Sequence, residues 1–188
     1  EKAADAYELV TRIKNAVLNY EIAAKDLLNM ESTKRLFEGT ARDFGPFLVT
    51  VGELSRSLGE FADLIRLLMD GIDDDDKDIP SFWESKMILR RLDEYVLLLK
   101  NFTVWEEKRE NVYWIQKKRL PPQMNVDSKD SEYIIMTETP LDISFIMNKG
   151  VFEEMRTVVC TSATLKTGRD FHYWMHRTGA DLCYEDKL

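Results

Sequence analysis

The residues best suited to chemistry lie near the C-terminus, in the run Thr161-Ser162-Ala163-Thr164-Leu165. The segment before it, Arg156 to Thr161, is rich in β-branched residues and predicts a strand. Hydroxyl side chains can both donate and accept hydrogen bonds. Taken alone, the three hydroxyl residues favour an ordinary role, because such residues often cap a turn between a strand and a loop.

A second candidate site combines basic and aromatic residues. Lys117-Lys118-Arg119 follows the pair Tyr113-Trp114, and Trp105 lies shortly before. Cations beside stacking rings suit single-stranded DNA, whose backbone is anionic and whose bases present π-faces. The alternative, which the residues alone favour, is that Trp114 packs in the core while the basic triplet is solvated. These six residues are the candidate DNA contacts.

Two patterns invite a metal-site interpretation, and neither completes it. His172 and His176 stand four residues apart on a predicted helix, but no third ligand is evident and Tyr173 follows the first histidine where a catalytic glutamate would stand. The run from Asp73 to Asp78 holds five carboxylates in six positions. It lacks the glycine that a calcium-binding EF-hand loop needs at its sixth position, so we expect a solvated loop there.

Composition sets the class of protein. The chain has 188 residues, of which 44% are hydrophobic and 32% charged, as in ordinary soluble domains. No apolar run reaches the roughly 20 residues of a membrane span, so we expect a cytoplasmic protein without a membrane partner. The chain begins at Glu1 without a methionine, and we expect it to be a piece of a longer protein.

Charge and cysteine content narrow the chemistry. The net charge is −8, with 14 basic and 20 acidic residues in 1–105 and 12 basic and 14 acidic residues in 106–188. The front would on average repel nucleic acid, whereas a local basic groove can exist in the rear. The cysteines, Cys160 and Cys183, form no C-x-x-C pair, which argues against a disulfide framework and against a zinc or iron–sulfur site. We expect Cys160 to be buried in a strand.

Apolar spacing predicts three long helices in the front part of the chain. The first runs from about Asp5 to Met30, and the second follows a loosening at Gly39 and Gly45-Pro46 and ends near Gly71. The third begins at a capping box formed by Ser81 and Glu84. Amphipathic helices joined by polar connections predict a helical bundle or hairpin over residues 1–105.

The signal changes to alternating strands and helices in residues 106–188. Strands are predicted at 112–115, 133–136 and 156–161, and short helices at 140–154 and 169–177. That order belongs to an α/β layer. The predicted fold is therefore mainly α, with a long-helix bundle followed by a partial α/β segment.

The rear of the chain resembles a known family. The elements that carry the resemblance are Thr139-Pro140-Leu141-Asp142-Ile143-Ser144, Val151-Phe152, the run from Val158 to Leu165, Phe171-His172-Tyr173-Trp174 and Arg177-Thr178-Gly179. In this order they resemble consecutive signatures of the DinG/XPD-type helicases, which are superfamily 2 motors. The match covers roughly residues 133–180, and Trp174 and Thr178 depart from it. The helical front agrees in length and position with the family's arch domain.

The resemblance implies a role for each part. The hydroxyl residues of 161–165 would couple ATP hydrolysis to translocation, with Ala163 keeping the turn small. The 106–188 segment would be part of a RecA-like helicase domain, and the arch would help to enclose single-stranded DNA during 5′ to 3′ movement. The remaining helicase domains would be the partners of this segment.

Two nucleotide-binding motifs are missing from the chain. It contains neither G-x-x-x-x-G-K-[ST] nor D-E-A-H, so ATP and Mg²⁺ would bind mainly outside it and it should not hydrolyse ATP alone. Iron–sulfur cysteines, where the family has them, fall before the arch, so this chain leaves the cluster undecided. The alternative is a non-enzymatic helical module that binds a protein partner. A P-loop and a D-E-x-H motif upstream of Glu1 would favour the helicase.

Overall fold

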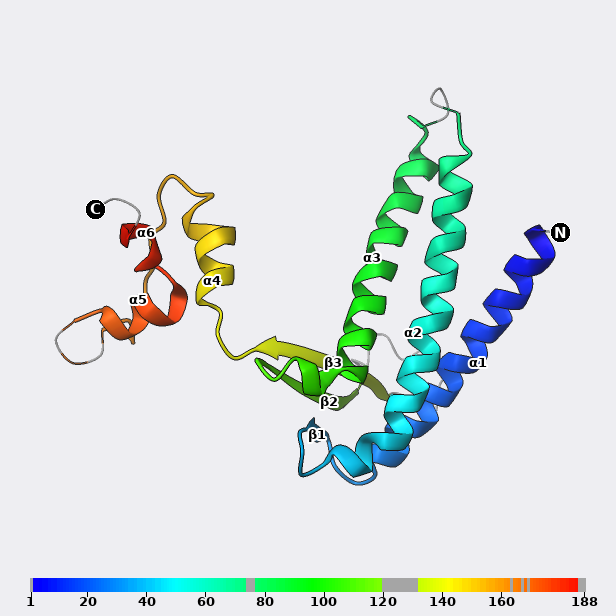
Figure 1. The fold of residues 1–188 in the computed structure, drawn as a ribbon, viewed down its shortest axis with the longest axis horizontal. Coiled ribbons are helices and arrows are strands. Elements are labelled where there is room, and N and C mark those ends of the chain that lie inside the picture. The colour runs from blue at the N-terminus through cyan, green and yellow to red at the C-terminus, as the bar shows by residue number, and fades with distance from the viewer. Residues whose placement is uncertain are drawn as a thin grey trace. The chain divides into compact units, whose positions relative to one another are not determined.

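The computed structural model describes residues 2–73, 77–119, 132–162, 164–166, 168 and 170–185. It is mainly helical, with a small three-stranded antiparallel sheet (Figure 1). The chain divides into two compact units, residues 1–139 and 140–188. This division lies later than the boundary after residue 105 that the sequence led us to expect.

The first unit is built on three long helices, as predicted. They are α1 (Lys2–Leu28), α2 (Ala41–Asp70) and α3 (Pro80–Thr103), and α2 packs against both of the others. The predicted loosening at Gly45-Pro46 is wrong, because α2 runs straight through it. Phe44 and Phe47 flank that dipeptide and are fully buried, which holds this turn of the helix in place despite the proline.

The start of α3 also differs from the prediction. Pro80 is the first helical residue, and Ile79 stands at the N-cap without a side-chain capping bond. Ser81 therefore lies inside the helix, where its carbonyl accepts a bond from the Ser85 hydroxyl at 2.8 Å. Proline at the first helical position has its backbone angle already set for a helix, so the expected capping box is not formed.

The sheet has the order β1-β2-β3 and comprises β1 (Thr33–Leu36), β2 (Asn111–Arg119) and β3 (Glu132–Pro140). The predicted strands at 112–115 and 133–136 are confirmed. Strand β1 was not predicted. It is antiparallel to β2, with Thr33 opposite Gln116 and Leu36 opposite Tyr113.

One core joins this sheet to the helices. The side chains of Tyr113 and Ile115 point inward from β2 and are fully buried. The ring of Tyr113 packs edge-on against Phe102 of α3, with 5.1 Å between centroids. Leu28 of α1 and Val51 of α2 belong to the same cluster. Strands β2 and β3 therefore belong with the helices, which explains why the unit ends at residue 139 rather than near 105.

The second unit contains only short helices among its described residues. They are α4 (Ser144–Met147), the π-helical turn η4 (Asn148–Phe152), α5 (His172–Thr178) and α6 (Leu182–Glu185). The helices expected at 140–154 and 169–177 are thus present in shorter form. In the parts of both units that the structure describes, no helix has the length and apolarity needed to cross a membrane.

The strand predicted at 156–161 is not formed. These residues have no regular structure, and Val159 is 82% exposed. Cys160, expected to be buried, is exposed. A strand needs a neighbour for its backbone hydrogen bonds, and none of the described residues of this unit supplies one.

Candidate functional site

The hydroxyl residues of 161–165 form a local turn on the surface. The Ser162 and Thr164 hydroxyl oxygens lie 3.0 Å apart, and the Thr164 amide donates to Ser162 Oγ at 3.2 Å. The Leu165 amide closes the turn by donating a hydrogen bond to the Ser162 carbonyl at 3.5 Å. Ala163 lies outside the described residues, and Thr161 is exposed. The arrangement is that of a serine turn with both hydroxyls open to solvent.

An open hollow of about 370 Å³ lies beside the preceding segment. Val158 and Cys160 contribute to its wall from that segment, and Trp174 and Met175 contribute from α5. Cys183, Arg156 and Thr157 also line it, so its wall mixes apolar and polar side chains and includes two thiols. Within the described ranges no group of three or more His, Cys, Asp or Glu side chains could hold a metal ion.

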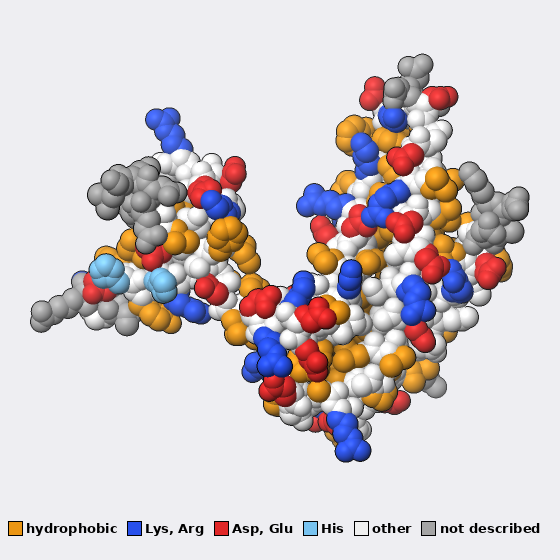
Figure 2. All heavy atoms as spheres, viewed as in Figure 1, with side chains coloured by type: hydrophobic (Ala, Val, Ile, Leu, Met, Phe, Trp, Pro, Cys, Tyr) orange, Lys and Arg blue, Asp and Glu red, His pale blue; other side chains and the backbone are white. Residues whose placement is uncertain are grey.

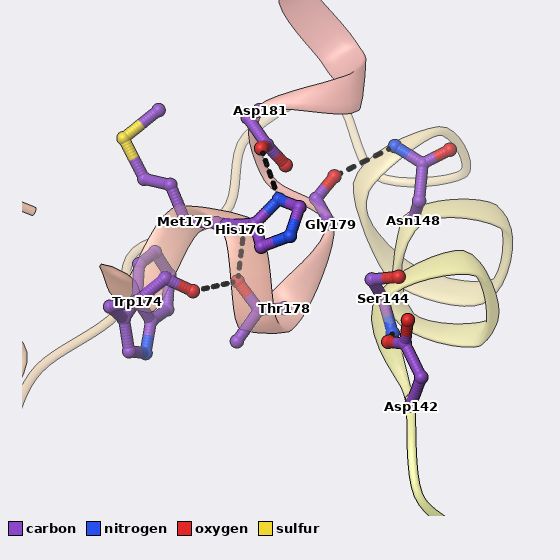
Figure 3. Close-up of polar contacts among 9 residues, drawn as sticks. All are labelled: Asp142, Ser144, Asn148, Trp174, Met175, His176, Thr178, Gly179 and Asp181. Carbon is purple, nitrogen blue, oxygen red and sulfur yellow. Dashed lines mark hydrogen bonds and ion pairs between the residues drawn. The ribbon is translucent and has the colours of Figure 1, made fainter. Parts of the chain in front are cut away.

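A tight joint links α4 to the end of α5 (Figure 3). Gly179 has a φ of +73°, and a Cβ added there would lie 2.0 Å from the backbone oxygen of Ser144. The Asn148 side chain is buried and donates to the Gly179 carbonyl at 3.1 Å. It also lies 3.2 Å from the Cys183 sulfur. Only glycine fits this close crossing of two backbones.

Asp142, in the element that resembles a helicase signature, caps α4. Its Oδ1 accepts a bond from the Ser144 amide at 2.8 Å (Figure 3). This backbone bond, with a further bond from the Ser144 side chain and the nearby Arg177 guanidinium, holds the pKa of Asp142 below its usual range. Arg177 also donates to the Leu141 carbonyl at 3.4 Å. The Asp142 carboxylate therefore helps to stabilise the α4–α5 joint.

The two histidines have separate surroundings. His176 Nδ1 lies 3.2 Å from Asp181 Oδ2, whereas the His172 amide bonds to Asp170 Oδ1 at 3.2 Å. The second oxygen of Asp181 is buried without a hydrogen-bond partner among the described residues. The two histidines therefore do not share one site: the His176 ring contacts Asp181 at the surface, and His172 has a different partner.

The basic and aromatic candidates are not brought into one accessible surface. Tyr113 is 1% exposed, so its ring cannot stack on a base, and this residue is removed from the candidate DNA contacts. Lys117 donates to the Asn29 carbonyl at 3.3 Å, and Arg119 lies 3.4 Å from Glu132. Trp105 packs against the core.

Three members of the set keep accessible side chains on β2. Trp114 is half-buried, and Lys118 and Arg119 are exposed. Along a strand, neighbouring side chains alternate between the two faces, so Trp114 points away from the core to which Tyr113 and Ile115 belong. The expectation that Trp114 packs in the core is therefore wrong, and its neighbour Tyr113 packs there instead.

Sequence reasoning missed a polar network around Glu138. Its carboxylate accepts bonds from Asn101 Nδ2 at 2.7 Å, Asn111 Nδ2 at 2.5 Å and the Tyr113 hydroxyl at 3.0 Å. Lys108 Nζ donates to Asn101 Oδ1 at 2.8 Å and so adds a positive charge at its edge. Burial, reinforced by the adjacent carboxylate, raises the pKa of Tyr113 to about 12. No local motif announces this network, because its members are brought together only by the fold.

Comparison of the chain with protein families, with curated proteins and with solved structures finds no match. Functional inference therefore depends on the residues and their geometry. Two features stand out after the structural bonds have been assigned. They are the solvent-facing hydroxyl turn at Ser162 and Thr164 and the unpaired β-branched segment before it.

Proposed function

We propose that this chain is a segment of an ATP-dependent DNA helicase of the DinG/XPD type. The observation that carries the proposal is the hydroxyl turn of Ser162 and Thr164, which follows a β-branched segment and keeps both hydroxyl groups exposed. In this role the turn senses the state of a nucleotide site outside the chain and passes it to the DNA-binding parts.

The chemistry of the turn fits such a role. Each hydroxyl can donate one hydrogen bond and accept others, and the bond between the two leaves capacity on both oxygens. A hydroxyl group is neutral, so it can donate a hydrogen bond to a carboxylate that binds Mg²⁺ without adding charge to the metal site. Ser162 and Thr164 can therefore follow a movement of that carboxylate by about one hydrogen-bond length.

The second unit supports the idea that other parts of a domain complete it. None of its described hydrophobic side chains is buried, and Phe145, Val159 and Tyr173 are each more than 60% exposed. A unit without a core cannot offset its loss of chain entropy. Residues 156–161 have the composition of a buried strand, so a sheet from the rest of a RecA-like domain would pair with them.

The proposal assigns the role of an arch to the helical front. Helices α2 and α3, of 30 and 24 residues, form an antiparallel hairpin about 35 to 45 Å long. In the proposed protein this hairpin leans over the path of single-stranded DNA, with movement from 5′ to 3′. ATP and Mg²⁺ bind to motor motifs outside residues 1–188.

The test compares hydroxyl variants in the longer protein. Ser162→Ala combined with Thr164→Ala should lower DNA-stimulated ATP hydrolysis and unwinding by about tenfold or more, as expected for the loss of one or two hydrogen bonds in the coupled state. ATP binding should stay unchanged. Ser85→Ala in α3 is the control, because its hydroxyl bonds only to its own helix. A longer protein without DNA-stimulated ATP hydrolysis, or a double variant that unwinds normally, would contradict the proposal.

A further inference from the structure

Helix α3 has an outward side that the core does not use. Its buried side chains are Phe82, Leu99 and Phe102, which contact the rest of the first unit. On the other side Trp83 is 55% exposed and Met87 is 61% exposed. Tryptophan is costly to leave in water, so two large apolar groups in adjacent turns indicate a contact surface.

Basic side chains surround these apolar groups. At 3.6 residues per turn, Arg90 and Arg91 follow Met87 on the same side of the helix, and both are exposed. Together with Glu94 these three residues line a shallow hollow of about 260 Å³. We call the set Trp83, Lys86, Met87, Arg90 and Arg91 the outward face of α3.

One cation on this face is already paired with a ring. Lys86 Nζ lies 4.8 Å from the centroid of the Trp83 ring and 4.9 Å from that of Phe82. The contact orients Trp83 while leaving more than half of it accessible. An aromatic ring held by a cation in this way is a ready stacking partner for another flat group.

The charge of the outward face departs from that of the chain. The chain carries a net charge of −8, whereas the three cations Lys86, Arg90 and Arg91 on this side of α3 outnumber the one carboxylate in the hollow of the two arginines, that of Glu94. Glu94 at its edge pairs with Arg90 at 3.2 Å, and both side chains are largely exposed, so the pair is weak and can be exchanged for a phosphate. Figure 2 shows Lys and Arg side chains interspersed with Asp and Glu over the α2–α3 region.

We propose that the outward face of α3 binds single-stranded DNA, with Trp83 stacking on a base and Lys86, Arg90 and Arg91 contacting phosphates. This proposal deepens the helicase function proposed above and rests on it. From Trp83 to Arg91 the face extends about 12 Å along the helix axis. That length suits a short site at the lower end of the range of about 4 to 16 nucleotides.

The charge and the ring together favour DNA over a protein partner. An apolar docking helix would have a continuous hydrophobic stripe, whereas here Arg90, Arg91 and Glu94 separate Trp83 and Met87 from the next exposed apolar residues on this side, Tyr95 and Leu97. Arginine forks match phosphate oxygens, and exposed tryptophan offers a π-face to any base. The same combination was sought in the sequence from Trp105 to Arg119, where the fold buries Tyr113 and pairs Arg119 with Glu132.

Salt dependence gives the sharpest test. Binding of the 188-residue chain to a fluorescein-labelled dT15 oligonucleotide is measured by fluorescence anisotropy between 25 and 200 mM NaCl, which are conditions of the assay. Three phosphate contacts on a single strand predict a slope of log K against log salt of about −2. Arg90→Ala with Arg91→Ala should reduce the slope to about −0.7.

The control variant removes the same charge elsewhere. Arg42→Ala with Arg56→Ala changes two exposed arginines of α2 and should leave the slope at about −2. Trp83→Ala should weaken binding about tenfold without changing the slope, because stacking carries no charge. Glu94→Gln should strengthen binding, since it frees Arg90; this variant keeps the test decisive if the alanine variants fold poorly.

Different results would contradict the DNA site on α3 and the helicase function. Equal effects of the α2 and α3 double variants would overturn the DNA site on α3, as would self-association of the chain that Trp83→Ala abolishes. If the longer protein shows DNA-stimulated ATP hydrolysis that Arg90→Ala with Arg91→Ala leaves intact, the helicase function stands and the α3 site fails. Binding to α3 with no ATP hydrolysis in the longer protein would refute the function instead.

Discussion

Replacing Gly179 by alanine should undo the joint between α4 and α5. The residue combines a left-handed backbone, at φ +73°, with a backbone crossing so close that a Cβ would lie 2.0 Å from the Ser144 oxygen. Real Cβ atoms are not found at such a distance, and the obstacle is backbone rather than a flexible side chain. Accommodating alanine therefore requires α4 to move away.

The expected cost can be worked out from the contacts. Left-handed backbone costs an alanine about 1 to 2 kcal/mol. Moving α4 also breaks the bond from the buried Asn148 amide to the Gly179 carbonyl, which costs about 1 to 3 kcal/mol if that polar group is left unpaired. The opposing effect of alanine on the unfolded chain is smaller, about 0.4 to 1 kcal/mol. The joint should lose roughly 1 to 5 kcal/mol of local stability.

Amide hydrogen exchange is the appropriate assay, because it reports local opening. The Ala180 amide, which bonds to the Met175 carbonyl at 2.9 Å, should lose its protection in Gly179→Ala. Two other variants separate the causes. Gly179→Asn relieves most of the backbone strain but keeps the clash. Gly168→Ala introduces a similar left-handed strain, at φ +75°, where nothing lies within 4 Å.

The reasoning predicts an order among the variants. Gly179→Ala and Gly179→Asn should both abolish protection at Ala180, whereas Gly168→Ala should leave it unchanged. If asparagine at position 179 behaves like glycine, backbone strain alone matters and the close crossing with Ser144 is refuted. If alanine at 179 is also harmless, the joint does not have the geometry described.

Two further predictions concern the Glu138 network. Glu138→Gln replaces one acceptor oxygen by a donor opposite Asn101 or Asn111 and should cost about 1 to 3 kcal/mol in urea unfolding, with the exposed Glu107→Gln as the neutral control. The pKa of Tyr113 is about 10 in the unfolded chain and about 12 in the folded protein, so stability should fall as the pH rises from about 10 to about 12. The fall arises because only the unfolded state releases the proton there. It should be smaller in Tyr113→Phe, where the remaining fall comes from Tyr20, whose pKa burial also raises.

Helix prediction succeeded where the period of apolar residues extends over many turns. The presence of α1, α2 and α3 follows from apolar residues three and four apart, because a long pattern averages out single exceptions. The buried side of α3 does not follow, since Met87, Ile88 and Tyr95 fit the apolar spacing and are more than half exposed. The errors lie at the boundaries. Gly45-Pro46 reads as a break, but tertiary burial of Phe44 and Phe47 outweighs the local cost of proline. Strand β1 has four residues, Thr33 to Leu36, too few for a pattern to be recognised.

Prediction of the candidate site was limited by contacts distant in the sequence. Tyr113 and Trp114 are neighbours, and only the pairing of β2 with β1 decides which ring enters the core. Glu138 gathers donors from α3 and β2, and no spacing in the chain encodes their convergence. The hydroxyl turn at Ser162 and Thr164 could be anticipated, because its bonds span only two residues.

The failed strand at 156–161 carries more functional information than the elements that were predicted well. Its β-branched residues have the composition of a buried strand, yet Val159 is 82% exposed and the described part of its unit buries no hydrophobic side chain. The local sequence therefore favours a buried strand, whereas the described residues around it provide neither a neighbouring strand nor a core. Foldable sequences usually keep these levels consistent, and under the proposed function a sheet from the rest of the RecA-like domain would supply the missing neighbour. Such a sheet would fix the strand and hold the Ser162–Thr164 turn at its end, where a coupling element has to lie.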